Sequence, residues 1–80
     1  MFPNYPGDNP TGNKFPQRLR AQRMACKLSR DDLAQMLGTS TVSIAKWETG
    51  KNEPGIAGII RLCNLFDVSA DYLIGRVDEL

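Results

Sequence analysis

Apolar side chains recur at helical spacing along two stretches in the middle of the chain. The residues that carry this pattern are Leu33, Ala34, Leu37, Ile44 and Trp47. Because residues three and four apart share one face of an α-helix, the pattern predicts two short helices with their apolar faces turned inward. Ser29 and Ser40 stand where N-terminal caps are needed, and Gly38 and Gly50 stand where the helices must end.

A further helix is expected before this pair, beginning near Phe15 and running to Ala25 or Cys26. The proline in its first turn suits that position, because proline lacks a backbone N–H that the start of a helix leaves unused. Two residues on its inner face, Gln22 and Arg23, are polar. At least one of them is expected to have a buried partner, since burying an unpaired polar group is costly.

The second half of the chain predicts two more helices. The first opens at Pro54, ends at Asp67 and is apolar over a broad face. The second is short, residues 70–74, with Ser69 as its cap. Lys27 and Asp67 stand at sharp turns, where the backbone is expected to take a positive φ. The apolar residues of the broad face are Ile56, Ile59, Ile60, Leu62, Cys63 and Phe66.

These helices predict an all-α fold, a compact five-helix bundle that occupies residues 15–75. A chain of 80 residues is long enough for one domain of modest stability. Residues 1–14 carry three prolines and two glycines without apolar periodicity, so they are expected to form a flexible N-terminal tail. Residues 76–80 are expected to form a short, fraying C-terminal end.

The net charge of +1 conceals an uneven distribution. Residues 14–51 contain eight basic and three acidic residues, a balance of +5, whereas residues 52–80 have a balance of −3. A protein with one basic pole can bind phosphate on one face only. The alternative interpretation is a solvated charged surface without function.

Several kinds of chemistry lack the residues they need. The chain has no histidine and only two cysteines, too few soft ligands for a zinc site. It has no glycine-rich phosphate loop and no nucleophile beside a base, so we expect no enzyme activity, no cofactor and no metal. No apolar run approaches the ~20 residues of a membrane span and no secretory signal is present, so a cytoplasmic protein is expected. Cys26 and Cys63 are expected to be small core residues, with redox sensing as the alternative.

Residues 28–54 read LSRDDLAQMLGTSTVSIAKWETGKNEP, with the spacing LAxxLGxSxxxIxxWExGxxxP. This stretch resembles the helix-turn-helix of the Cro and phage-repressor type, also called the xenobiotic-response-element family. The similarity continues into that family's fourth and fifth helices through residues 54–75, PGIAGIIRLCNLFDVSADYLIG. The resemblance implies a lambda-repressor-like DNA-binding domain, in which helices two and three form the helix-turn-helix.

The resemblance also implies a transcriptional regulator, with repression as the expected sign, that binds double-stranded operator DNA as a homodimer. Because the chain is short, helices four and five are expected to form the dimer contact. Its third helix, residues 41–49, would lie in the major groove. The base-contacting residues carried over are Thr41, Val42, Ser43, Ala45 and Lys46. The phosphate-contacting residues carried over are Ser29, Arg30, Ser40, Thr49, Lys51 and Asn52. The family often pairs an arginine late in helix one with the glutamate before the terminal glycine, here Arg23 and Glu48, as a structural ion pair.

Two alternatives remain open at this point. In one, the helix-turn-helix is only a scaffold, and the apolar surface of helices four and five binds a protein partner. That surface would include Ile60, Leu65, Tyr72 and Ile74. In the other, the protein is an antitoxin that autoregulates its operon. A restriction–modification controller fits the same motif, and the operator, the regulated genes, any effector and the sign of regulation are open too.

Overall fold

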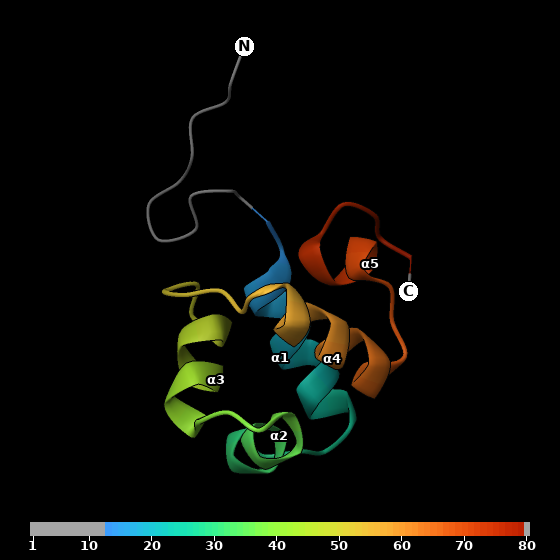
Figure 1. Cartoon of the computed structure of the whole chain (residues 1–80). Coiled ribbons are helices and arrows are strands. Elements are labelled where there is room, and N and C mark those ends of the chain that lie inside the picture. The colour runs from blue at the N-terminus through green and yellow to red at the C-terminus, as the bar shows by residue number, and fades with distance from the viewer. Residues whose placement is uncertain (1–12, 80) are drawn as a thin grey trace.

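Five α-helices make up the part of the chain that the computed structural model describes, residues 13–79 (Figure 1). They are α1 (Phe15–Ala25), α2 (Arg30–Leu37), α3 (Thr41–Glu48), α4 (Ile56–Phe66) and α5 (Ala70–Ile74). No strand occurs within these described residues, so the predicted all-α five-helix fold is confirmed. The expectation of a flexible tail concerns residues 1–14, most of which lie outside the described range.

One apolar core lies at the centre of the bundle, and every helix contributes to it. Its buried residues are Phe15, Leu19, Leu33, Ala34, Leu37, Ile44, Trp47, Leu62, Phe66, Val68 and Leu73. Burying a large apolar side chain stabilises a fold by roughly 1.5–3 kcal/mol, before the entropy of ordering it is counted. The inward stripes predicted for residues 33–37 and 44–47 are confirmed.

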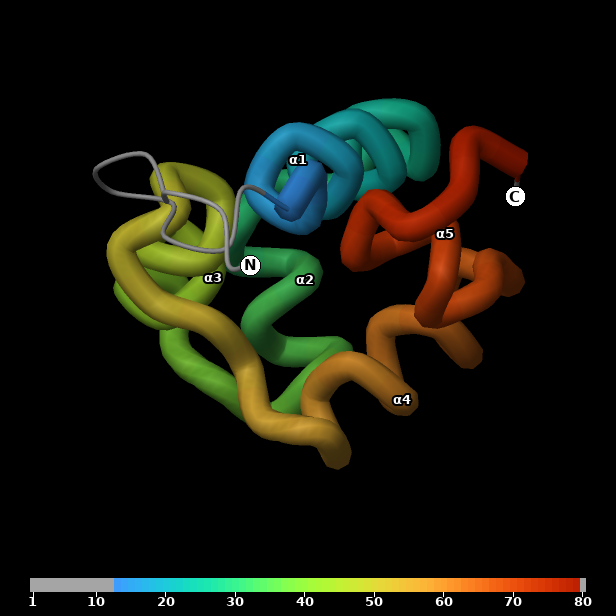
Figure 2. The backbone as a smooth tube through the Cα atoms, turned by 90° about the horizontal axis from the view of Figure 1, so that it is seen from above, coloured from blue at the N-terminus to red at the C-terminus, as the bar shows by residue number. Residues whose placement is uncertain are grey.

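Figure 2 shows from above how the five helices are arranged around the centre of the bundle. α3 packs against both α1 and α2, while α5 packs against α1 and α4. α4 also contacts α2, which closes the bundle. None of the helices among residues 13–79 is long and apolar enough to cross a membrane.

Three serines cap helices, as their positions predicted. The Ser29 hydroxyl accepts a hydrogen bond from the backbone N–H of Asp32 at the start of α2. The Ser40 hydroxyl accepts one from the N–H of Ser43 at the start of α3, and Ser69 caps α5 in the same way. Each bond satisfies a backbone donor that has no carbonyl partner within its own helix.

Two sharp turns place a non-glycine residue in the left-handed region, as expected. The φ angle is 57° at Lys27, between α1 and α2, and 55° at Asp67, between α4 and α5. An L-residue in this region costs roughly 1–2 kcal/mol, because its Cβ crowds the following carbonyl oxygen. The fold therefore carries local strain at both turns.

The start of α4 differs from the expectation. The helix begins at Ile56 with Gly55 as its N-cap, so Pro54 precedes the helix and does not open it. Ile56 is 82% exposed and Ile60 is 55% exposed, whereas Ile59 between them packs against the core. The broad apolar face of this helix is thus only partly covered.

Two helix ends also differ in detail. α3 ends at Glu48, and Thr49 is its C-cap residue, so the helix is one residue shorter than predicted. Cys26, expected in the core, is exposed, because α1 stops before it and Cys26 is the C-cap. Cys63 is half-buried against the core, and this burial raises the pKa of its thiol.

The end of the described chain, expected to fray, is tied to α1. The Arg18 guanidinium donates to the carbonyl oxygens of Tyr72 and Val77 and to the Asp78 carboxylate. It also lies over the Tyr72 ring, 4.2 Å from the ring centroid. Lys14 pairs with the same carboxylate at 3.2 Å. Lys14 and Arg18 together hold the pKa of Asp78 below its ordinary value.

Candidate nucleic-acid interface

α3 has one buried face and one exposed face. Ile44 and Trp47 are buried in the core, on the side that meets α1 and α2. The other residues of the helix include the five predicted to contact bases, Thr41, Val42, Ser43, Ala45 and Lys46, all exposed or half-buried. Val42, near the start of the helix, is 62% exposed although it is apolar. The outer face of α3 is therefore open to a partner.

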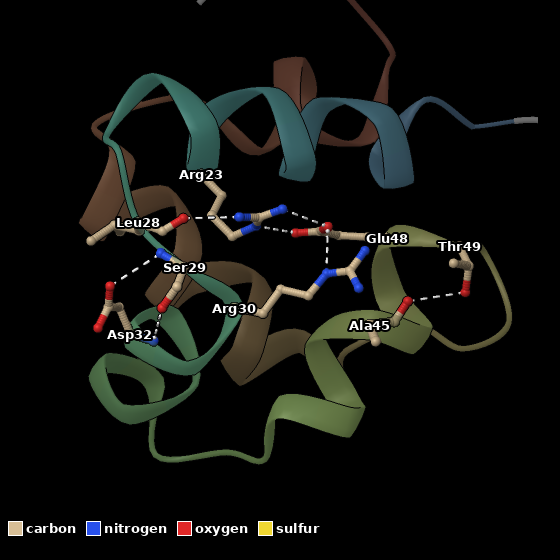
Figure 3. A network of polar contacts seen from close by, with 8 residues as sticks. All are labelled: Arg23, Leu28, Ser29, Arg30, Asp32, Ala45, Glu48 and Thr49. Atoms are coloured by element: carbon tan, nitrogen blue, oxygen red, sulfur yellow. Dashed lines mark hydrogen bonds and ion pairs between the residues drawn. The ribbon is translucent and has the colours of Figure 1, made fainter.

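Glu48, in the last turn of α3, is a buried carboxylate whose side chain is only 1% exposed. Nε of Arg23 lies 2.6 Å from its Oε2, and Nη2 of Arg23 lies 3.1 Å from its Oε1. Nε of Arg30 lies 3.2 Å from the same Oε1. Figure 3 shows the guanidinium groups of α1 and α2 converging on this carboxylate of α3. The predicted ion pair between Arg23 and Glu48 is present.

This cluster of charges fastens the end of α3 to two other helices. A buried carboxylate is tolerated when it is paired and hydrogen-bonded. Arg23 is held from a second side, because its Nη1 donates to the Leu28 carbonyl oxygen at 2.8 Å (Figure 3). The hydrogen bond to Glu48 raises the pKa of Arg23 above its ordinary value, and burial opposes this rise. The orientation of α3 therefore rests on directional bonds as well as on apolar packing.

Arg30 has a partner that sequence reasoning missed. Arg30 was predicted to contact phosphate, and in the structure its Nε also pairs with Glu48. The Arg30 side chain remains 41% exposed, so part of the guanidinium stays at the surface at the start of α2. Two arginines facing one carboxylate leave a net positive charge there. Only the angle between α2 and α3 brings these residues together, and no local pattern in the sequence signals it.

The starts of α2 and α3 already use the hydroxyls predicted to contact phosphate. At α2, Ser29 and Asp32 form a reciprocal capping box, with the Asp32 carboxylate 3.1 Å from the Ser29 backbone N. This hydrogen bond lowers the pKa of Asp32. At α3, the Ser40 hydroxyl donates to the Ser43 hydroxyl at 3.0 Å. The unpaired N–H groups of a first helical turn remain the natural donors to an anion at such sites.

The turn after α3 collects the other predicted phosphate contacts. The Thr49 hydroxyl donates to the carbonyl oxygens of Ala45 and Lys46, at 3.0 and 3.2 Å. The backbone N–H groups of Lys51 and Asn52 also donate to the Lys46 carbonyl, at 3.0 and 3.3 Å. Because Lys51 and Asn52 are exposed, their polar groups stand at the surface beside the end of α3.

A second contact missed from the sequence joins the starts of the two helices. The hydroxyl of Thr41, the first residue of α3, donates a hydrogen bond to the Asp31 carboxylate in the first turn of α2. The two residues are ten apart in the sequence and belong to different helices, so helical periodicity does not relate them. This contact brings the Asp31 carboxylate, which lies next to Asp32 in the first turn of α2, to the start of α3.

Metal chemistry has no visible site in this region. Across residues 13–79, no group of three or more His, Cys, Asp or Glu side chains could hold a metal ion. Beside the exposed carboxylates of Asp31 and Asp32, the surface of α2, α3 and the following turn presents hydroxyls, cationic groups and helix starts. Groups of this kind are suited to an anionic partner.

Known proteins that resemble this chain share a helix-turn-helix. The family model described as Helix-turn-helix matches residues 19–73 of the chain. The chain is 36% identical over 63 residues to the uncharacterized HTH-type transcriptional regulator YobD of Bacillus subtilis, covering 79% of this chain and 56% of YobD. It is 30% identical over 63 residues to the cryptic phage CTXphi transcriptional repressor RstR of Vibrio cholerae, with the same two coverages of 79% and 56%. The chain thus spans about half the length of these curated relatives.

The fold also has solved counterparts. The crystal structure of the P22 c2 repressor protein in complex with a synthetic operator matches with a TM-score of 0.71 and 33% identity. The match covers 75% of this chain and 91% of the repressor chain. The lambda-repressor-like arrangement implied by the resemblance is confirmed.

Proposed function

The chain belongs to the helix-turn-helix family, and we propose that it is a sequence-specific double-stranded DNA-binding protein that regulates transcription as a repressor. In this proposal α3 lies in the major groove of the operator. The observation that carries it is the division of α3 into an inner face, held by the core and by Glu48, and an open outer face. A major groove about 12 Å wide admits a helix presented in this way.

The outer face of α3 supplies the base contacts of the proposal. Lys46 is exposed and can donate to guanine O6 and N7, while the methyl groups of Val42 can contact a thymine methyl. Ser43 and Ala45 are small and half-buried, so they let the helix approach the base edges closely. Thr41 completes the set at the start of the helix.

The flanks of α3 supply the phosphate contacts. Lys51 and the exposed part of Arg30 provide positive charge on either side of the helix. The other assigned residues are Ser29, Ser40, Thr49 and Asn52, which border the starts of α2 and α3 and the turn after α3. Because several of their hydroxyls have partners within the protein, backbone N–H groups and cations carry most of this contact in the proposal.

The relatives support the regulatory role, and two of them support its sign. RstR is named as a transcriptional repressor, and the P22 c2 repressor is described in complex with a synthetic operator. We assign the same role to this chain, which places it in the cytoplasm beside the DNA that it regulates.

Binding to duplex DNA at several salt concentrations tests the proposal. Selection from a random duplex library, followed by fluorescence anisotropy on the selected site, should give an affinity that falls steeply as salt increases. The reason is that each neutralised phosphate releases condensed counterions. Absence of binding to any duplex at low salt would overturn the proposal.

A matched pair of lysine variants tests the assignment of Lys46 to a base contact and of Lys51 to a phosphate contact. Lys46→Ala should change which base is preferred at one position of the site, because it removes a base contact. Lys51→Ala should weaken binding to all sequences about equally and reduce the salt slope by about 1. Arg20→Ala, an exposed position on α1, serves as the control for a simple loss of charge. Identical behaviour of the Lys46 and Lys51 variants would contradict the assignment.

We further propose that the protein acts as a homodimer through α4 and α5. Ile56 and Ile60 lie one turn apart on α4 and are 82% and 55% exposed. Exposed apolar surface of this kind is typical of a contact face, and a two-fold dimer allows two short helices to read paired half-sites. Light scattering with and without a selected duplex measures the stoichiometry.

The same two isoleucines favour the second candidate, a protein-interaction module. In that case α4 and α5 bind a different protein, and the outer face of α3 does not bind DNA. Salt-dependent binding to duplex DNA decides between the two functions, because only the DNA-binding protein shows it.

A further inference from the structure

The hydrogen bond between Thr41 and Asp31 leaves the pair with acceptors only. Thr41 Oγ1 is the donor and Asp31 Oδ1 is the acceptor, and both residues are exposed. A threonine hydroxyl has a single proton, and an ionised carboxylate has none. Once that proton points to Asp31, the outward side of the pair presents oxygen lone pairs and no donor.

We infer that Asp31 and Thr41 make the N-terminal end of α3 selective for a base with an amino group in the major groove, cytosine before adenine. The inference rests on the proposed function. Cytosine presents only the N4 amino donor there, and adenine presents its N6 amino donor beside the N7 acceptor. Guanine presents two acceptors, and thymine presents an acceptor and a methyl group. An acceptor facing another acceptor leaves both without a partner in a dry interface.

Capping does not account for Asp31. The reciprocal cap of α2 is formed by Ser29 and Asp32, which leaves the Asp31 carboxylate available to Thr41. A carboxylate at a surface that binds phosphate is repelled by the backbone of DNA. The helix dipole favours Asp31 in the first turn of α2, and a donor on each side, Thr41 and a base amino group, would offset the repulsion from DNA.

The two residues have different roles in this account. Thr41, at the first position of α3, is the residue that touches the base. Asp31 is a positioning residue, because it sets the direction of the Thr41 hydroxyl proton. When DNA displaces water from the interface, the lower local dielectric strengthens this hydrogen bond, so the hydroxyl direction persists in the complex.

Selection of binding sites with three variants tests the inference. Thr41→Val keeps the shape and removes the hydroxyl, so the base position whose preference it alters is the position that Thr41 reads. At that position the wild type should select cytosine, roughly tenfold over guanine. Asp31→Ala should admit guanine there, because the released hydroxyl proton can point to the O6 or N7 acceptor. In the Thr41→Val background, Asp31→Ala should leave the base preference unchanged.

Two controls separate base selection from charge and folding. Asp67→Asn removes one negative charge at the C-cap of α4, where asparagine also tolerates the left-handed backbone, and should leave base selection as in the wild type. Circular dichroism of each variant should match that of the wild type.

The possible failures are distinct. A wild type that binds a specific site but selects guanine or thymine at the Thr41 position overturns this inference and leaves the proposed function intact. So does an Asp31→Ala protein with an unchanged preference, or a Thr41→Val protein that alters no position. A wild type that binds no duplex overturns both.

Discussion

The α2–α3 pair and the α4–α5 pair differ in the surface that they expose and in the contacts that hold them in the bundle. The exposed part of α2–α3 lies in the stretch that carries a balance of +5 and is mostly polar, with Met36 and Val42 as its exposed apolar residues, whereas α4 exposes two isoleucines within a stretch that carries −3. A basic surface suits phosphate, and an apolar surface suits another protein chain. The bundle therefore separates its two proposed contacts, DNA on one pair and a second protomer on the other.

The attachment of the two pairs differs as well. α3 is held by buried apolar residues and by the carboxylate of Glu48, which meets arginines from two other helices. α4 and α5 contribute to the core through apolar side chains, Leu62, Phe66 and Leu73, and α5 also accepts a hydrogen bond from Arg18 at the Tyr72 carbonyl. Apolar packing is not directional, but hydrogen-bonded ion pairs are. The helix whose angle matters most for the proposed function is attached through a buried carboxylate that two arginines share.

The largest expected effect comes from breaking the polar attachment of α3. Arg23→Ala leaves the buried Glu48 carboxylate with Arg30 alone, and removing one partner of a buried pair costs about 3–5 kcal/mol in the free energy of unfolding. Urea denaturation followed by the fluorescence of Trp47, the single tryptophan, measures the loss. Arg20→Ala, at an exposed position of the same helix, should change stability by less than about 0.5 kcal/mol. Equal losses for the two variants would show that the network is not structural.

The next effect concerns the apolar surface of α4. Ile56→Asp should weaken self-association by on the order of 100-fold, because a two-fold interface loses the contact twice. The urea midpoint of the monomer should hardly change, since Ile56 is 82% exposed. Sedimentation equilibrium measures the dissociation constant, and Met24→Asp, at an exposed apolar position of α1, is the control. If the Met24 variant weakens association as much, the interface lies elsewhere.

A smaller effect separates the two strained turns. Lys27→Gly should raise the free energy of unfolding by roughly 0.5–1 kcal/mol, because glycine removes the left-handed strain at a φ of 57° and returns part of the gain as chain entropy. Asp67→Gly, at a φ of 55°, should gain less, since aspartate tolerates this region better than lysine. Urea denaturation of both variants at neutral pH gives the comparison. A larger gain at Asp67 than at Lys27 would contradict this explanation.

The smallest effect appears in acid. Lys14 and Arg18 lower the pKa of Asp78 in the folded protein, so their contribution to stability is present above the unfolded pKa, near 4. It is lost as the pH falls through the lower, folded pKa. The wild type should therefore lose more stability between pH 5 and pH ~2 than Asp78→Asn does. Urea midpoints across this range measure the difference, and parallel curves for the two proteins would show that the contacts of Lys14 and Arg18 with Asp78 do not stabilise the fold.

Local signals explain why much of the fold was predictable. Serine caps at Ser29, Ser40 and Ser69, and the inward stripes of α2 and α3, depend on spacings of a few residues. The turns at Lys27 and Asp67 could also be placed, because each follows the end of an apolar repeat. Two predicted helices were too long at one end. Cys26 is the C-cap residue that follows α1, and Pro54 precedes α4.

Contacts between helices were harder to predict. The pair of Arg23 and Glu48 was expected from the family resemblance, since both polar residues fall on apolar faces. The contacts of Arg30 with Glu48 and of Thr41 with Asp31 join residues 18 and 10 apart. They depend on the angle at which α2 meets α3, which no spacing in the sequence specifies. The residues assigned to bases and phosphates remain predictions.

The attachment of α3 at its last turn has a consequence for how this protein family diversifies. Stability resides in the inner face and in Glu48, while Val42 and Lys46 on the outer face contribute little to the core. Substitutions at the outer positions are therefore close to neutral for folding. Under the proposed function, a descendant can acquire a new target site through one or two such changes, without first passing through an unstable intermediate.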